Sequence, residues 1–102
     1  MSQLRPQAAT APIDVEAEAK AFIFFKESRN RLDAENPYGC QGLGQDCNGQ
    51  LHIECPSWRT DHACQGGFWE RYMARRYGSW QAAKAHWLTR VQIDGRDVGH
   101  WW

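Results

Sequence analysis

The stretch Cys40–Cys64, CQGLGQDCNGQLHIECPSWRTDHAC, contains all four cysteines of the chain. Their spacing is C-x6-C-x7-C-x8-C, which lacks the tight C-x2-4-C pairs that usually bring zinc ligands together. An even number of cysteines in a short, loop-rich segment indicates two disulfides and an oxidising compartment instead. Of the three pairings, we favour Cys40–Cys47 with Cys55–Cys64; free thiols in a cytosolic protein are the alternative.

The segments before and after the cysteines have helical periodicity. A first helix is predicted to begin after the N-cap candidate Asp14 and to end at about Ser28. Asp61 is expected to cap a second helix, His62–Tyr77, which carries an apolar stripe at helical spacing. A third helix is predicted at about Trp80–Thr89. The sequence therefore predicts a mainly α fold.

Between the first two helices the periodic pattern is lost. Arg31–Arg59 is rich in Asn, Pro, Gly and Gln, so we predict a long irregular region that the disulfides hold in place. A turn is expected at Asp94-Gly95 in the tail. Residues 1–12 are predicted to be a disordered leader or linker, and residues 13–102 to form one domain.

Composition excludes several classes of protein. The chain has 102 residues, with 12 basic and 12 acidic side chains that cancel. This balance lacks the basic character expected of a nucleic-acid binder. The longest compact apolar run, Ala21–Phe25, is far too short to cross a bilayer. The start of the chain lacks the charged and apolar regions of a secretory signal, so we expect either a trimmed signal or another export route.

Three motifs occur in an order and spacing that resemble the lysozyme-like lytic transglycosylase superfamily. The first is Lys26-Glu27-Ser28 followed by Asp33–Pro37, similar to the family's helix-ending Glu-Ser and its Ala-x-Asn-Pro. The second, Gly39–Gln45, is similar to a Gly-x-x-Gly-Leu-x-Gln turn. The third, Tyr72–Ser79 with His86-Trp87 after it, is similar to the Tyr-x-x-x-Arg-Tyr-Gly-Ser block before a final aromatic helix. The small domains of aggregation-promoting-factor and phage-tail proteins are the most similar, which implies a small lysozyme-like domain.

The resemblance implies that Glu27 is the single catalytic acid. An ordinary glutamic acid has a pKa near 4.3 and is mostly ionised at neutral pH. Apolar neighbours, here Phe22–Phe25, raise the pKa of a buried acid, and a helix C-terminus also disfavours a negative charge. On position alone, Glu27 would be a solvated helix-end residue. Most glycosidases use two carboxylates, but no candidate for a second one is supported by the resemblance. These candidates are Asp33, Glu35, Asp46, Asp61 and Glu70.

Three further residues are expected to bind the substrate. Gln45 would hold the sugar or the catalytic loop through its amide, with Gly42 and Gly44 allowing close backbone approach; its alternative is an ordinary turn residue. Ser28 is expected to stabilise the active-site loop by hydrogen bonding. The sequence lacks the Ala-Tyr-Asn motif of the larger transglycosylases, and the role of that motif's tyrosine is assigned to Tyr77.

Other chemistries fit the sequence less well. The four histidines show no metal-ligand spacing, so no metal site is predicted. Cys40 paired with a histidine would give a cell-wall peptidase, but the neighbouring cysteines favour crosslinking. Arg75 and Arg76 are interpreted as a solvated helix face that could also meet carboxylates of the wall.

The sequence thus predicts a monomeric enzyme of the cell envelope or extracellular space that needs no cofactor. Its expected partner is the glycan strand of peptidoglycan, cut between N-acetylmuramic acid and N-acetylglucosamine, with 1,6-anhydro products. The alternatives are a catalytically idle wall-binding module and a disulfide-stapled structural module of a surface or phage-tail protein.

Overall fold

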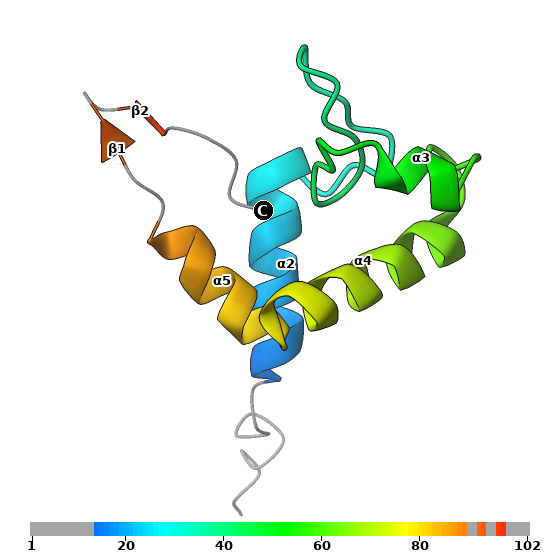
Figure 1. Ribbon diagram of the computed structural model, residues 1–102. Coiled ribbons are helices and arrows are strands. Elements are labelled where there is room, and N and C mark those ends of the chain that lie inside the picture. The colour runs from blue at the N-terminus through cyan, green and yellow to red at the C-terminus, as the bar shows by residue number, and fades with distance from the viewer. Residues whose placement is uncertain (1–13, 90–91, 94–95, 98–102) are drawn as a thin grey trace, which may run out of the picture.

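The computed structural model describes residues 14–89, 92–93 and 96–97 and is mainly helical (Figure 1). Its elements in chain order are α2 Val15–Ser28, α3 Gln50–Glu54, α4 His62–Tyr77, α5 Trp80–Leu88, β1 Gln92–Ile93 and β2 Arg96–Asp97. The two short strands pair antiparallel. The leader, the turn expected at Asp94-Gly95 and the C-terminal tryptophans lie outside the described residues.

Helix α2 begins and ends as the sequence predicts. The Asp14 side chain accepts hydrogen bonds from the backbone N–H groups of Glu16 and Ala17, each at 3.1 Å. This satisfies N–H groups that have no partner inside the helix. Arg29 adopts a left-handed conformation after the last helical residue, and its N–H bonds back to the helix. The α2 C-terminus therefore stops sharply just beyond Glu27 and Ser28.

Helices α4 and α5 also confirm the predicted pattern. Asp61 accepts a hydrogen bond from the backbone N–H of Cys64 at 3.0 Å, and Ser79 accepts one from Ala82 at 3.0 Å. Gly78 ends α4 with a φ of 90°, a conformation that costs glycine little. The chain turns there, so that α4 and α5 diverge in a V, with α2 passing near its vertex (Figure 1).

Two side chains of α2 bond to α4 and α5 near this vertex. The Glu16 carboxylate accepts hydrogen bonds from the backbone N–H groups of Trp80 (2.7 Å) and Gln81 (3.0 Å) at the start of α5. A carboxylate is favourable there because the helix N-terminus is partially positive. Lys20 forms an ion pair with Glu70 of α4 at 2.6 Å.

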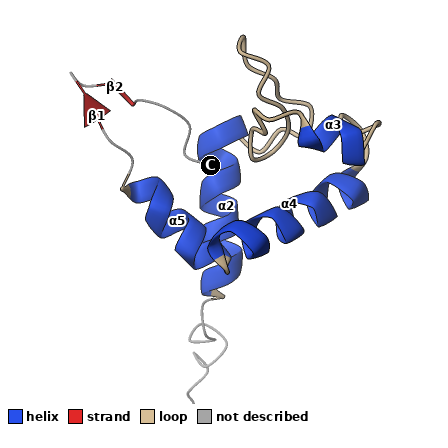
Figure 2. Cartoon of the chain, in the orientation of Figure 1, coloured by secondary structure: helices blue, strands red, loops and turns tan. Residues whose placement is uncertain are grey.

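Helix α3 corrects the prediction that residues 31–59 are irregular throughout. The buried Asp46 carboxylate accepts hydrogen bonds from the backbone N–H groups of Asn48 (3.1 Å) and Leu51 (2.8 Å). Leu51 is fully buried in the core. Five residues are too few to produce a periodic pattern, and such a short helix depends on tertiary contacts for its stability. The rest of this region is loops and turns (Figure 2).

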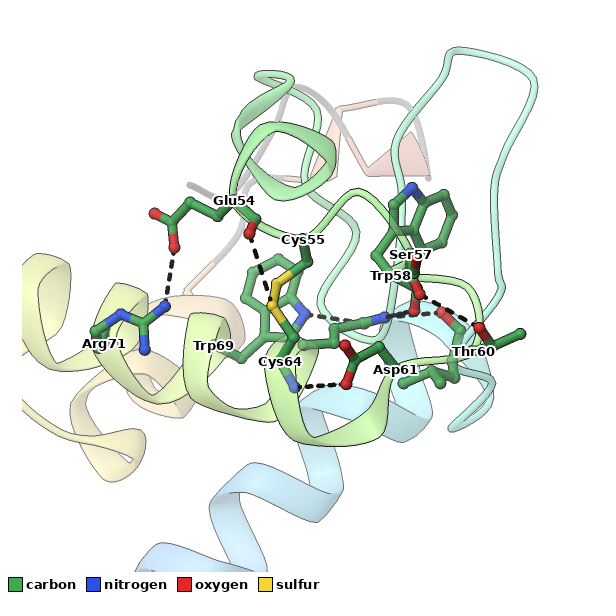
Figure 3. Close-up of a disulfide and its surroundings, with 11 residues drawn as sticks. Glu54, Cys55, Ser57, Trp58, Thr60, Asp61, Cys64, Trp69 and Arg71 are labelled. Atoms are coloured by element: carbon green, nitrogen blue, oxygen red, sulfur yellow. Dashed lines mark hydrogen bonds and ion pairs between the residues drawn. A yellow bond between two sulfur atoms is a disulfide. The ribbon is translucent and has the colours of Figure 1, made fainter.

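Two disulfides crosslink this region, with the pairing that we favoured. Cys40 is bonded to Cys47, and Cys55 to Cys64. The second disulfide joins the end of α3 to the first turn of α4, beside the Trp69 ring (Figure 3). Each crosslink restricts the unfolded chain, which typically stabilises a protein by about 2–4 kcal/mol.

The core lies where α2, α4, α5 and the crosslinked loops meet. Its members are buried apolar residues from all four segments: Ala19, Ile23, Phe24, Leu43, Leu51, Cys55, Trp58, Phe68, Trp69, Tyr72, Met73, Trp80 and Ala83. One buried polar residue, Gln65 of α4, lies among them with no exposed surface. Its oxygen accepts hydrogen bonds from Leu43 N–H (2.6 Å) and the Trp69 indole (3.1 Å).

The nitrogen of the same amide donates to two backbone carbonyls, those of Leu32 (3.1 Å) and Trp58 (2.8 Å). Gln65 therefore has both its donors and its acceptor engaged, as a buried amide requires. Because its partners come from three loop segments and α4, this one side chain fixes the loops against the helix.

Candidate active site

A pocket of about 180 Å³ lies at the C-terminal end of α2. It is lined by the end of that helix and by the loops after it: Glu27, Ser28, Arg29, Arg31, Ala34, Glu35, Asn36 and Gln45. The structure thus brings together Glu27, Ser28 and Gln45, three of the four residues predicted for the site. Glu27 and Ser28 come from the end of α2, and Gln45 comes from a loop that the first disulfide crosslinks and that Gln65 bonds to α4.

The Glu27 carboxyl group is half-buried and held by a residue of another helix. Its Oε2 accepts a hydrogen bond from the Trp87 indole Nε1–H at 2.6 Å. The Trp87 ring packs edge-to-face on Phe22 of α2, with ring centroids 5.4 Å apart. The carboxyl group is therefore fixed in place between α2 and α5.

Trp87 is a site residue that sequence reasoning missed. In the sequence, Trp87 belongs only to the end of the third motif, and 60 residues separate it from Glu27. A contact at that separation has no local signal in a single sequence. The resemblance to the family's final aromatic helix was the one hint available.

Ser28 lines the pocket but uses its hydroxyl within its own helix. The hydroxyl donates a hydrogen bond to the backbone carbonyl of Phe24 at 2.9 Å, and the residue is buried. No described histidine forms a hydrogen bond with Ser28 Oγ. Ser28 therefore stabilises the end of α2 and the base of the pocket.

Gln45 has its amide nitrogen committed to the loop. Nε2 donates to the carbonyl oxygens of Gly42 (2.9 Å) and Ala34 (3.3 Å). Of the two roles expected for this amide, the contacts correspond to holding the loop. The residue adopts a left-handed φ of 60°, which is uncommon for a non-glycine residue.

Gly42 and Gly44, the two glycines before Gln45, are required for different reasons. Gly42 has a φ of 83°, as expected of a position that favours glycine. Gly44 does not have a positive φ, so its role is the close approach expected of it and not a special backbone conformation. A Cβ atom at Gly44 would lie 2.7 Å from the Trp69 ring, so this glycine is required for close packing on α4.

A second carboxylate, Glu35, lines the same pocket. It forms an ion pair with Arg59 and a hydrogen bond with Gln41 (3.4 Å). The hydrogen bond from Arg59, followed by that from Gln41, holds the pKa of the Glu35 carboxyl below its usual value. Glu35 is therefore ionised at neutral pH and cannot serve as a proton donor there.

The other acidic candidates lie outside the pocket lining and have structural roles or none that is visible. Asp46 and Asp61 cap helices, and Glu70 accepts a hydrogen bond from the Trp80 indole at 2.8 Å besides its ion pair with Lys20. Asp33 is an exposed turn residue. Of the two carboxylates in the pocket lining, Glu35 pairs with Arg59 and Glu27 bonds to the Trp87 indole.

Tyr77 does not line the pocket, although the sequence assigned it to the substrate site. It is half-buried at the end of α4, with its ring centroid 5.1 Å from that of His86. Burial raises the pKa of its hydroxyl. Tyr77 thus packs against the residue that precedes Trp87, whose indole bonds to Glu27.

No family model, curated protein or solved structure matches this chain. Within the described residues, no three His, Cys, Asp or Glu side chains gather closely enough to hold a metal ion. The described helices are also too short or too polar to cross a membrane.

Proposed function

We propose that the protein is a lysozyme-like enzyme that cleaves the β-1,4 glycosidic bonds of peptidoglycan, with Glu27 as its single acid and base. The observation that carries the proposal is the placement of Glu27. Its half-buried carboxyl group projects into a pocket at a sharp helix end, and the Trp87 indole fixes it there. The loop that carries Gln45 forms another part of the wall.

The proposed reaction needs one proton carrier. Glu27 donates its proton to the oxygen that links N-acetylmuramic acid to N-acetylglucosamine, and the bond from this oxygen to the anomeric carbon breaks. The 6-hydroxyl of the same muramic acid attacks the anomeric carbon and returns its proton to Glu27. The products are a shortened strand and a 1,6-anhydromuramyl end, with no water consumed.

Glu35 is not assigned a proton-transfer step in this scheme. Its ion pair with Arg59 keeps it charged, so it contributes a fixed negative charge near the site. Such a charge favours the positive character that develops on the sugar ring as the glycosidic bond breaks.

The proposed location is the extracellular space or the cell envelope. Disulfides form and persist in oxidising compartments, and both bonds here hold loops that build the proposed site. Peptidoglycan lies in the same compartments.

Purified, dye-labelled peptidoglycan gives a direct test of the function. We expect the protein with its disulfides intact to release soluble dye in proportion to time and protein concentration. Protein that is reduced, unfolded and alkylated should release none. Tight binding to the wall material without any release would contradict the enzyme and support an idle wall-binding module.

Trp87→Phe should lower the catalytic rate while preserving most of the fold. The substitution keeps an aromatic ring against Phe22 but removes the N–H group that holds Glu27. A hydrogen bond between neutral groups contributes about 0.5–1.5 kcal/mol, so we expect kcat to fall about two- to tenfold with little change in KM. Steady-state kinetics on soluble glycan strands measures both constants.

Trp80→Phe is the matched control for this variant. It removes an indole N–H that bonds to Glu70, in the same helix but outside the pocket. Its kcat per folded molecule should equal that of the wild type. Equal losses of kcat in both variants would show that Trp87 acts through stability and not by positioning Glu27.

A further inference from the structure

A second pocket, of about 390 Å³, lies between the last turns of α4 and the loop that enters α3. Its lining is polar and consists of Asn48, Gln50, Tyr72, Arg75 and Arg76. Asn48 is only three residues beyond Gln45, which lines the first pocket, so their Cα atoms lie at most about 11 Å apart. The two pockets therefore flank one short stretch of chain.

The charged residues that line this second pocket are all positive. No acidic residue is among its lining residues, and neither Arg75 nor Arg76 forms an ion pair with any described carboxylate. This is not a general property of arginines on α4. Arg71, one turn earlier, is paired with Glu54 at 2.9 Å. The pocket thus presents two guanidinium groups whose charge the described side chains do not neutralise.

The surroundings of these arginines are held in place. Tyr72 is buried, and burial raises the pKa of its hydroxyl, which therefore stays protonated and neutral at physiological pH. The Arg75 guanidinium lies 5.9 Å from the centre of the Tyr72 ring. Opposite α4, the Cys40–Cys47 disulfide and the Asp46 hydrogen bonds fix the loop that carries Asn48. Guanidinium groups favour an anion with two oxygens, because guanidinium and carboxylate groups can form paired hydrogen bonds.

We infer that this second pocket binds a carboxylate group of the peptide stem that hangs from muramic acid. The inference rests on the proposed function, because the ligand is taken from the polymer that Glu27 would cut. Each muramic acid carries its peptide on the lactyl group, and free carboxylates occur along that peptide. A strand with its scissile bond at Glu27 would present such a stem beside the cleavage site, where Arg75 and Arg76 lie across the loop. The pocket would then make the enzyme select strands with charged stems over bare glycan.

Binding of the wild-type protein to a disaccharide-peptide tests this inference without depending on turnover. The probe is N-acetylglucosamine linked to N-acetylmuramic acid with its peptide, which contains no bond of the type that the enzyme would cut. We expect the probe with free carboxylates to bind roughly tenfold or more tightly than the same probe with amidated carboxylates, as measured by calorimetry. The Arg75→Gln/Arg76→Gln variant should lose this preference.

Arg71→Gln is the control, because it removes the same charge from the same helix outside the pocket. Its preference for the free carboxylates should match that of the wild type. Circular dichroism should show that all variants are folded. Equal affinity of the wild-type protein for both probes would overturn the inference, and so would a preference that survives in the double variant. Inorganic phosphate that displaces the probe at equal concentration would also overturn it, since the pocket would then take any small oxyanion.

The outcomes separate this inference from the proposed function. Cleavage of peptidoglycan without a carboxylate preference would refute the inference and leave the enzyme in place. A carboxylate preference without cleavage would support the binding pocket and refute the enzyme.

Discussion

Glu27→Gln is expected to reduce peptidoglycan cleavage by about 10²–10⁴-fold, the range typical for the loss of a general acid. Glutamine has nearly the same shape and still offers an oxygen to the Trp87 indole. It carries no acidic proton, so the departing sugar oxygen would leave as a high-energy anion. Affinity for an uncleavable disaccharide-peptide and the free energy of unfolding should change little. Release of dye-labelled fragments from peptidoglycan measures the loss of activity.

Two further variants make this result specific. Glu18→Gln removes a negative charge from the same helix at an exposed position outside the pocket, and it should leave the rate unchanged. Glu35→Gln removes the other carboxylate of the pocket and should lower the rate by less than Glu27→Gln, because Glu35 transfers no proton in the proposed reaction. Wild-type rates in Glu27→Gln would refute the mechanism. Equal losses in the Glu27 and Glu35 variants would indicate a two-carboxylate hydrolase.

Gln65→Leu is expected to cause a large loss of stability. Gln65 is fully buried, and its amide bonds to the Leu43 N–H, the Trp69 indole and two backbone carbonyls. Leucine fills a similar volume but leaves these groups without partners, and an unsatisfied buried group costs about 1–3 kcal/mol. Because the loops can relax partly, we expect a total loss of about 3–5 kcal/mol in the free energy of unfolding.

Urea denaturation with the disulfides intact measures this loss. Gln81→Leu, at an exposed position of α5, is the control and should change the free energy of unfolding by less than about 0.5 kcal/mol. If Gln65→Leu also changed the value by less than 1 kcal/mol, the Gln65 hydrogen bonds would not be what holds the loops to α4.

The helices could be predicted because their determinants are local. Asp14, Asp61 and Ser79 each cap the helix that follows them in the chain. Gly78 marks a stop by its own conformational freedom. The disulfide pairing could also be predicted, because each bond joins two cysteines that follow one another along the chain with no other cysteine between them.

The contacts that build the site could not be predicted from local sequence signals. Gln65 is a polar residue inside an apolar stripe, and nothing local indicates that backbone groups of three loop segments bond to it. Gly44 is required by the Trp69 ring, which is 25 positions further along the chain. Trp87 bonds to Glu27 although 60 positions of the chain separate them. In each case the deciding partner is supplied by tertiary packing.

Mass spectrometry of peptidoglycan digested by the purified protein tests the central claim most directly. We predict disaccharide-peptides that end in 1,6-anhydromuramic acid and are lighter by one water than the corresponding reducing-end fragments. Their yield should grow with digestion time in the wild type and should be nearly absent for Glu27→Gln. Fragments cut only within the peptide stems, or undigested peptidoglycan after incubation with folded protein, would contradict glycan cleavage by Glu27.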